Sequence, residues 1–240
     1  METNDKWFKM ARAASERSAL EYQAWFDASE SMDEVKSQGT LDFFHRIWLP
    51  DCYEWIGNPH GQVALEIGSG GGRLLANAAS IFDKAIGCDV VYGPGGTSSH
   101  TREYILNQGI RETKFDLIAP DVLSSIPDDS INFIYSFIAF QHMDNIDTIF
   151  NYLREIKRLS NPRNFTRIFC SGANIHGALT KSVEDNSAFD VTFMCDPRWF
   201  ASNIKLLGGE VINIDLAPRK QLWNHQDRSG QFMISFRYVK

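Results

Sequence analysis

The sequence predicts an α/β fold in which helices cover a mostly parallel sheet. Two observations lead to this prediction. Residues 63–67 form a short apolar run that enters a turn with four glycines, and a helix-compatible run over residues 73–82 follows at once. Residues 131–137 are the most strongly apolar run of the chain, which is typical of a central parallel strand that helices cover on both faces.

We expect residues 61–240 to form one domain behind a helical extension of residues 1–60. Strand-like and helix-like runs alternate after the first strand, as a parallel sheet with crossover helices requires. The further predicted elements are a strand at 84–90, a loop at 91–97, a helix at 98–108, a strand at 115–118, a helix at 147–159, a strand at 166–170, a helix at 197–207 and strands at 211–216 and 231–239.

Length and composition exclude several classes of protein. At 43% hydrophobic residues, a chain of 240 residues can bury one sizeable core. Its net charge of −6 argues against a protein that holds nucleic acid by neutralising phosphates. The four cysteines, Cys52, Cys88, Cys170 and Cys195, lie far apart without a C-x-x-C pair. We therefore predict reduced, mostly buried thiols, with no disulfide framework and no metal site.

The sequence gives no sign of secretion or of membrane insertion. Residues 1–9 carry acids and lack the apolar segment of a secretory signal. No apolar run approaches the roughly 20 residues that a membrane span needs. We therefore expect a cytoplasmic protein whose partner is a small molecule, with no nucleic acid and no membrane span. The oligomeric state is not predicted.

The extension over residues 1–60 is unusually aromatic. Tyr22 and Phe26, like Phe44 and Trp48, are four residues apart, which places each pair on one face of an α-helix. Most of these rings are expected to pack the extension onto the core. Residues 29–39 are polar and acidic, and they are expected to form a connection or the hinge of a lid.

Some of these side chains are candidates for contacts with a substrate. Small-molecule pockets are mostly apolar with a few polar groups. We therefore expect Trp25, Phe44 and Trp48 to roof a ligand cleft, with core packing as the alternative for each. Arg46 is expected to lie exposed on the surface, and contact with a carboxylate is the alternative.

The glycine turn carries the strongest functional signal. Its spacing is Gly68-x-Gly70-x-Gly72, with Ser69 inside it and Glu66 two residues before it. Glycine adopts positive φ angles at low cost and lets a ligand approach the backbone with no Cβ in the way. The free N–H groups of the helix that follows favour an anionic or carboxylate-bearing ligand.

Asp89 ends the second predicted strand, 17 residues after Gly72. Ligands of open α/β sheets lie outside the carboxyl ends of the strands, and an acid at this spacing accepts hydrogen bonds from ribose hydroxyls. The two motifs together indicate an adenosine-type ligand. The alternative is that Asp89 lies in a solvent-exposed loop.

The turn and its acid resemble motif I of the class I S-adenosylmethionine (SAM)-dependent methyltransferases, which is an acid, any residue, then Gly-x-Gly-x-Gly. The resemblance covers about residues 60–240. It implies a Rossmann-like, mostly parallel sheet that ends in an antiparallel hairpin. It also implies SAM as cofactor and S-adenosylhomocysteine (SAH) as product.

Other parts of the family pattern follow in order along the chain. An acid and a small apolar residue after the third strand read the adenine, and Asp121 and Val122 match that place; the alternative is that Asp121 caps a helical turn. The segment from Ser136 to His142 resembles the exit of the fourth strand, where the chain passes the sulfonium. The implied cofactor contacts are Glu66, Gly68, Ser69, Gly70, Gly72, Asp89, Val90, Asp121, Val122 and Ser136.

The candidate catalytic residues are two histidines and one acid. A hydroxyl acceptor gains from a base that removes its proton as attack proceeds. His142 is the first candidate and His176, after the fifth strand, is the second. Asp144 could orient His142 or share a metal with other carboxylates, although no spacing indicates a metal site. A purely structural role is the alternative for each histidine.

The acceptor that we expect is a hydroxyl of a sugar or of another polyhydroxylated metabolite. N-methylation of a small molecule is the runner-up. A NAD(P)-dependent oxidoreductase is disfavoured, because its glycine spacing differs and the final hairpin is unexpected in that fold. A non-catalytic, methyltransferase-like partner subunit is the remaining alternative, and a measurement of SAM binding would separate it from an enzyme.

Overall fold

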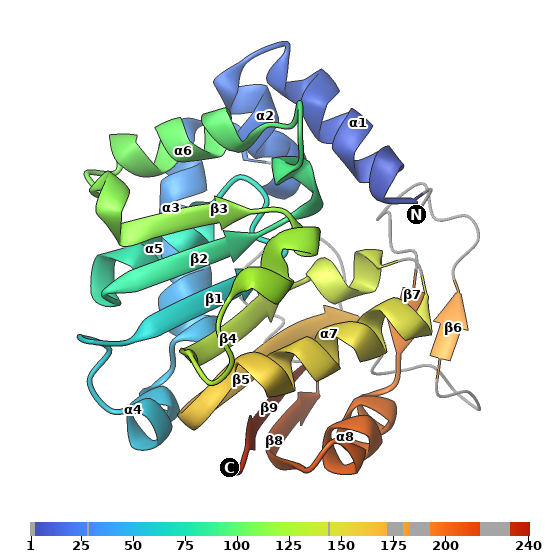
Figure 1. The fold of residues 1–240 in the computed structure, drawn as a ribbon. Helices are drawn as coiled ribbons and strands as arrows, with labels where there is room; N and C mark the ends of the chain where they lie inside the picture. The colour runs from blue at the N-terminus through green and yellow to red at the C-terminus, as the bar shows by residue number, and fades with distance from the viewer. Residues whose placement is uncertain (1–2, 28, 144, 172–179, 183–192, 217–230) are drawn as a thin grey trace.

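The computed structural model describes residues 3–27, 29–143, 145–171, 180–182, 193–216 and 231–240. A seven-stranded sheet forms its centre (Figure 1). Its strands are β1 (Val63–Ile67), β2 (Lys84–Cys88), β3 (Phe115–Ile118), β4 (Ile131–Phe137), β5 (Ser160–Ser171), β8 (Gly209–Leu216) and β9 (Gln231–Tyr238). Two short strands, β6 (Thr180–Ser182) and β7 (Phe193–Cys195), pair separately.

The strand order is β3-β2-β1-β4-β5-β9-β8. The first five strands in this order pair in parallel, and β9 runs antiparallel to both of its neighbours. The predicted α/β sheet and its C-terminal antiparallel hairpin are therefore confirmed. Because the parallel strands end at one edge, the segments that follow β1, β2 and β4 are brought together there.

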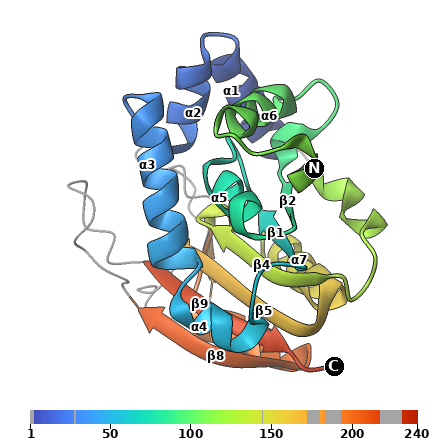
Figure 2. The ribbon, with the colours of Figure 1, turned by 90° about the vertical axis from the view of Figure 1, so that its left-hand side faces the viewer.

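Helices cover both faces of the sheet (Figures 1 and 2). They are α1 (Thr3–Ser15), α2 (Ala19–Asp27), α3 (Met32–Asp42), α4 (Pro50–Ile56), α5 (Arg73–Ile81), α6 (Ser98–Asn107), α7 (Ile146–Leu159) and α8 (Pro197–Leu206). One apolar core joins the sheet to α3, α4, α5 and α6, and a second joins it to α7 and α8. None of the described helices is long and apolar enough to cross a membrane.

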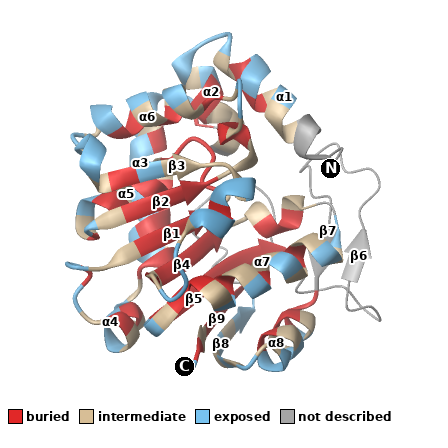
Figure 3. Cartoon of the chain, viewed as in Figure 1, coloured by how far each residue is buried: buried red, intermediate tan, exposed pale blue. Residues whose placement is uncertain are grey.

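Burial follows the position of each strand in the sheet (Figure 3). Every residue of β1 and β2 after the first is buried, and β4 is buried at five of seven positions, which fits a central strand covered on both faces. The edge strand β8 has no buried residue. The bounds of β3 and β4 agree with the sequence prediction, whereas β5 begins six residues earlier than the predicted 166, directly after α7.

The expected hinge at residues 29–39 is wrong, because most of that segment belongs to α3. Ser31 caps the helix: its Oγ accepts a hydrogen bond of 3.2 Å from the backbone N–H of Glu34. This Ser-x-x-Glu spacing is a helix-start signal that the polar composition obscured. Gly39 lets α3 approach α5, since a Cβ there would lie 2.6 Å from the carbonyl oxygen of Arg73.

The expectation that Phe44 and Trp48 share a helix face is also wrong. Residues Phe43–Ile47 form a π-helical turn, η1, in which the N–H of Trp48 donates to the carbonyl of Phe43. The wider turn breaks the α-helical spacing on which the prediction rested. Trp48 is consequently buried at 3% exposure, whereas Phe44 remains 37% exposed.

The expected loop at residues 91–97 begins with a short 3₁₀ turn, η2 (Val90–Tyr92). Its N-cap is Asp89, whose side chain accepts a hydrogen bond from the N–H of Val91. Val91 and Tyr92 are both buried. These two side chains pack with Ala11 and Tyr22 of the helical extension, while residues 93–97 form the expected loop.

One arginine on β5 connects the sheet to the N-terminal helices. Arg167 is 1% exposed, and its guanidinium donates to the carbonyl of Ile47 at 2.7 Å and to Ser235 Oγ at 3.0 Å. It also pairs with Asp51 at the start of α4. A buried guanidinium is tolerated only when its donors are satisfied, so these contacts fix α4 on the sheet.

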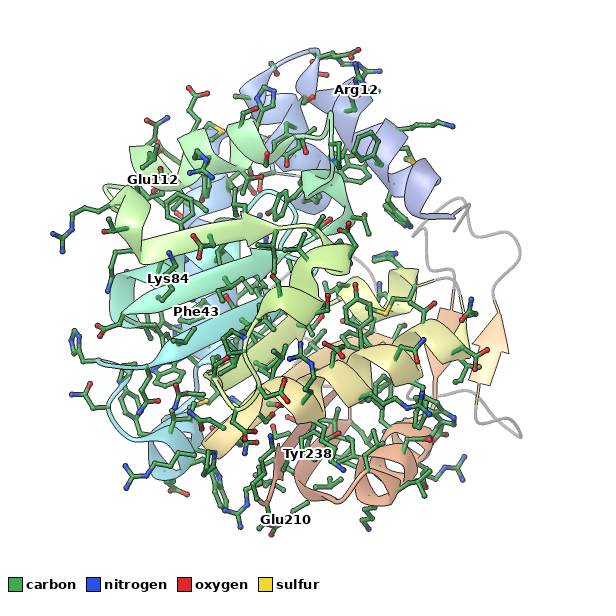
Figure 4. All side chains as sticks on the ribbon, viewed as in Figure 1. Arg12, Phe43, Lys84, Glu112, Glu210 and Tyr238 are labelled. Atoms are coloured by element: carbon green, nitrogen blue, oxygen red, sulfur yellow. The ribbon has the colours of Figure 1, made fainter. Side chains whose placement is uncertain are left out.

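We predict that Arg167→Met lowers the free energy of unfolding by about 3 kcal/mol, because it leaves buried acceptors without a donor. Arg237→Met is the matched control: Arg237 lies half-buried on neighbouring β9, pairs with the exposed Glu210 (labelled in Figure 4) and lies over the ring of Trp55, so its loss should cost about 1 kcal/mol. Urea unfolding of both variants measures the difference. Equal losses would show that Arg167 contributes no more than a surface pair.

Candidate active site

The carboxyl ends of β1, β2 and β4 carry the residues that the sequence singled out. Gly68–Gly72 follow β1, Asp89 follows β2, and the 3₁₀ turn η5 (Ala139–His142) follows β4 after one intervening residue. Hydrogen bonds join these segments: the N–H of Gly70 donates to Asp89 Oδ2 at 2.8 Å, and Ser136 Oγ donates to the carbonyl of Ile67 at 2.8 Å. The parallel sheet therefore gathers most of the predicted cofactor contacts at one edge.

The glycines are needed for both conformation and space. Gly68, Gly70 and Gly72 have φ angles of 77°, 47° and 81°, which lie in the left-handed region. A Cβ on Gly68 would lie 2.0 Å from the Cβ of Ala139, and one on Gly72 would lie 2.7 Å from Thr101 Cγ2. The turn thus brings its backbone into direct contact with η5 and α6.

Asp89 is held by backbone donors at the end of β2. Its Oδ2 accepts from Gly70, and its Oδ1 accepts from the N–H of Val91 at 3.1 Å. Burial raises the pKa of this carboxyl above its ordinary value, although the backbone N–H groups act in the opposite direction. A carboxylate offers about four lone-pair sites, so the group can still accept a further hydrogen bond.

A network of hydroxyl groups supports the turn from behind. The carbonyl of Gly70 accepts hydrogen bonds from the Tyr92 hydroxyl at 2.5 Å and from Thr101 Oγ1 at 3.0 Å. The Tyr22 hydroxyl in turn lies 2.8 Å from Thr101 Oγ1 and 2.9 Å from Thr97 Oγ1. α2, η2 and α6 are thereby tied to one peptide group. Tyr92 was not predicted to take part, because its segment was expected to be a loop.

Glu66 lies beneath the turn and contacts the neighbouring strand. It is 2% exposed, and its Oε2 accepts a hydrogen bond of 3.0 Å from the Tyr135 hydroxyl of β4. Burial raises the pKa of Glu66 well above its ordinary value, while the Tyr135 hydrogen bond and the charge of Arg73 act against the shift. The structure thus places this carboxyl between β1 and β4.

Two arginines and one aspartate form a charged cluster beside the turn. Asp42 lies 2.6 Å from Arg73 and 3.3 Å from Arg46, and the three side chains are 4–12% exposed. Both guanidinium groups lie over the ring of Phe137, at 5.5 and 5.8 Å from its centroid. The cluster, Asp42–Arg46–Arg73, therefore combines two positive charges with one negative charge.

Arg73 was not selected from the sequence, although a signal was present. It is the first residue of α5, where the helix dipole disfavours a cation. An arginine directly after the glycine run therefore needs an acidic partner, and Asp42 supplies it from α3. Arg46 was expected to be exposed or to meet a carboxylate. It meets the carboxylate of Asp42 and is mostly buried, so the expected exposed position is wrong.

The end of α2 lies directly on the glycine turn. Gln23 Nε2 donates to the carbonyl of Gly71 at 2.9 Å, and a Cβ on Gly70 would lie 2.6 Å from the ring of Phe26. The ring of Trp25 packs against Phe26 at 4.6 Å and lies 5.6 Å from that of Trp7 on α1. α1 and α2 therefore form an aromatic cover over this part of the edge.

His142 is at the end of η5, below that cover. Its ring lies 4.6 Å from the ring of Trp7, in an edge-to-face arrangement. It is therefore at the predicted edge of the sheet. The other two candidate catalytic residues, His176 and Asp144, lie outside the described residues.

Asp121 and Val122 lie in the 3₁₀ turn η4 (Pro120–Ser125) after β3, and both are exposed. Asp121 does not cap this turn, because no side chain does. Burial raises the pKa of the Cys88 thiol, and the charges of Asp89 and Asp121 add to that shift. Asp121 thus lies near the end of β2, on the same edge as Asp89.

Not all of the predicted aromatic contacts reach this edge. Trp48 lies in the core, with its ring 5.1 Å from that of Phe82 and 5.2 Å from that of Phe133. We therefore leave it out of the candidate site. Phe44 lies on η1, packed against Phe43, two residues before Arg46. In the described part of the chain, no three His, Cys, Asp or Glu side chains are grouped to hold a metal ion.

Comparison with known proteins gives matches in fold only. No family model matches the chain, and no curated protein matches it in sequence. The 1,6-didemethyltoxoflavin-N1-methyltransferase of Burkholderia thailandensis, solved with 1,6-didemethyltoxoflavin and SAH, is 16% identical, with a TM-score of 0.59 over 86% of this chain and 88% of that chain. The mitomycin 7-O-methyltransferase MmcR is 14% identical, with a TM-score of 0.59 over 97% of this chain and 60% of that chain.

A third solved structure has a different activity in its name. The cyclase SpnF is 13% identical, with a TM-score of 0.59 over 86% of this chain and 82% of that chain. At such low identities the likeness concerns the path of the backbone and does not extend to the reaction. The chain has the fold of the class I SAM-dependent methyltransferases.

Proposed function

We propose that the protein is a SAM-dependent methyltransferase that acts on a hydroxyl of a sugar or of another polyhydroxylated metabolite. The observation that carries the proposal is the hydrogen bond between Gly70 and Asp89. It places an acid with free lone pairs directly against a glycine turn, at the edge where open α/β sheets bind their ligands.

The chemistry of the neighbouring groups fits SAM. Asp89 can still accept a hydrogen bond from a ribose hydroxyl, and Asp121 and Val122 lie along the same edge for the adenine. The amino-acid part of SAM is a zwitterion, and the Asp42–Arg46–Arg73 cluster offers both signs of charge next to the turn. A guanidinium is suited to a carboxylate because it can donate two parallel hydrogen bonds.

When bound, SAM supplies a methyl group on a good leaving group. The protein's task is then to align the acceptor and to exclude water. The rings of Trp7, Trp25 and Phe26 form an apolar cover for that purpose. His142 lies beneath Trp7, where a neutral imidazole can accept the proton of a hydroxyl acceptor.

The fold leaves two alternatives open. The solved structures with this fold include an N-methyltransferase, an O-methyltransferase and a cyclase. The identity of the acceptor must therefore be inferred from the side chains of the site and not from the fold. A small-molecule amine needs alignment but no base, and is the first alternative. A non-catalytic partner subunit is the second, and a measurement of SAM binding separates it from an enzyme.

We predict that Asp89→Ala weakens SAH binding by about 1–3 kcal/mol, or roughly 5- to 150-fold, because it removes a charged acceptor from the ribose. Because burial raises the pKa of Asp89, SAH affinity should fall as pH drops through that raised value, and Asp89→Ala should lose this dependence. Titration calorimetry measures both effects. Asp116→Ala, at an exposed pair on β3, is the control and should bind like the parent. Binding of NADH in place of SAH would refute the proposal.

We predict that His142→Ala lowers kcat at least about 100-fold with SAH affinity nearly unchanged, because it removes the base for a hydroxyl acceptor. The acceptor would first be found by screening hydroxylated metabolites for SAM-dependent formation of SAH. His60→Ala, at an exposed position before β1, is the control. Undiminished turnover in His142→Ala would point to an amine acceptor, or to His176 if His176→Ala is inactive.

We further propose that α1 and α2 form a lid over the site. Arg12 and Arg17 are 58% and 72% exposed on this unit, and Figure 4 shows Arg12 on its outer side. We predict that saturating SAH slows tryptic cleavage after both residues, while Gln23→Ala speeds it by removing the contact to Gly71. Cleavage after Lys205 on α8 serves as the internal control. Equal protection at all three sites would indicate global stabilisation and contradict the lid.

A further inference from the structure

Ile138 has an unusual backbone conformation at the centre of the candidate site. Its φ and ψ angles are 68° and −10°, in the left-handed region that β-branched residues avoid. Among the residues that the structure describes, Asp129 is the only other non-glycine residue with positive φ. Asp129 lies in the turn before β4, at the opposite end of that strand, and aspartate tolerates this conformation better.

The chain on either side of Ile138 is fixed by close contacts. The N–H of Ile138 donates to the carbonyl of Phe169 at 2.9 Å, which extends the pairing with β5 by one step. Ala139 lies directly against the glycine turn, since a Cβ on Gly68 would be 2.0 Å from its own Cβ. Phe140 is fully buried beside the rings of Tyr152 and Phe200. The left-handed turn is therefore required for η5 to meet these neighbours.

Ile138 also separates the two functional parts of the site. Phe137, on its N-terminal side, lies under the guanidinium groups of Arg46 and Arg73. His142 follows four residues later, against Trp7. The angle of the chain at Ile138 thus sets where the imidazole lies relative to the charged cluster and the glycine turn.

We propose that Ile138 is a positioning residue, whose left-handed turn holds η5 against Gly68 and so sets the position of His142. Glycine would adopt these angles without strain, but it would also leave the turn free to adopt others. A branched side chain restricts the backbone angles at its own position. With isoleucine at position 138, η5 can therefore adopt fewer positions than it could with glycine. This inference rests on the proposed function for the role of His142.

Two roles of Ile138, stabilising the fold and positioning His142, can be tested separately. In Ile138→Gly the relief of strain opposes the loss of a partly buried side chain and the greater freedom of the unfolded chain, so the thermal midpoint should change little. At the same time η5 should sample several positions, so the imidazole signal of His142 should broaden or split in proton–nitrogen correlation spectra. SAH affinity should weaken about five-fold, because binding must then order the turn. A residue that serves stability alone would lower the midpoint and leave the other two measurements unchanged.

Three further variants complete the experiment. Ile138→Val keeps the branched side chain and should retain the single imidazole signal and the parent's SAH affinity. Asp129→Gly relieves the other strained turn, at the loss of an exposed ion pair with Lys240, and should change neither. His142→Gln assigns the signal among the six histidines.

The inference is overturned if Ile138→Gly keeps one sharp His142 signal, or if Asp129→Gly broadens that signal equally. The spectra need no ligand. A parent protein that binds no SAH would therefore contradict the proposed function. The His142 signal would still show whether Ile138 positions the imidazole.

Discussion

Close approach at the glycine turn is the constraint on which this edge of the sheet depends. A Cβ at Gly68, Gly70 or Gly72 would lie 2.0, 2.6 and 2.7 Å from atoms of η5, α2 and α6, respectively. Real Cβ atoms do not approach other atoms so closely, so each of these elements packs against bare backbone. A substitution in the turn would therefore displace the protein's own elements as well as a ligand. The turn joins three parts of the chain that are distant in sequence.

The buried charges around the turn are each held by a partner of matching chemistry. Backbone N–H groups hold Asp89, the Tyr135 hydroxyl holds Glu66, and Asp42 lies between two guanidinium groups. Burial nevertheless raises the pKa of Asp89 and that of Glu66, because these partners replace only part of the lost hydration. Further donors, such as ribose hydroxyls, would favour the ionised form of Asp89. The electrostatics of the edge thus suit a ligand rich in hydrogen-bond donors.

The features that the sequence predicts correctly are those set by residues close together in the chain. The bounds of β3 and β4 and the glycine turn follow from short runs of residue type, and Asp89 follows from its spacing to the turn. The charged cluster could not be predicted, because the chain brings Asp42 to Arg73 across 31 positions. The φ angle of Ile138 leaves no trace in a sequence, since an isoleucine there suggests only a continuing strand. Trp48 was wrongly predicted to share a helix face with Phe44, because the π-helical turn at Phe43–Ile47 breaks the α-helical spacing of the two residues.

The helical extension consists of two parts with different attachments. α3 reaches the core through Gly39, through the ion pair between Asp42 and Arg73, and through the buried side chain of Val35. α2 instead contacts the glycine turn, through a hydrogen bond from Gln23 and the ring of Phe26, and it reaches α6 through the buried Tyr22 hydroxyl. A helix whose side chains lie on this turn would be stabilised or displaced by a ligand that bound there. Any motion of the extension that accompanies binding should therefore be confined to α1 and α2, while α3 and α4 remain part of the core.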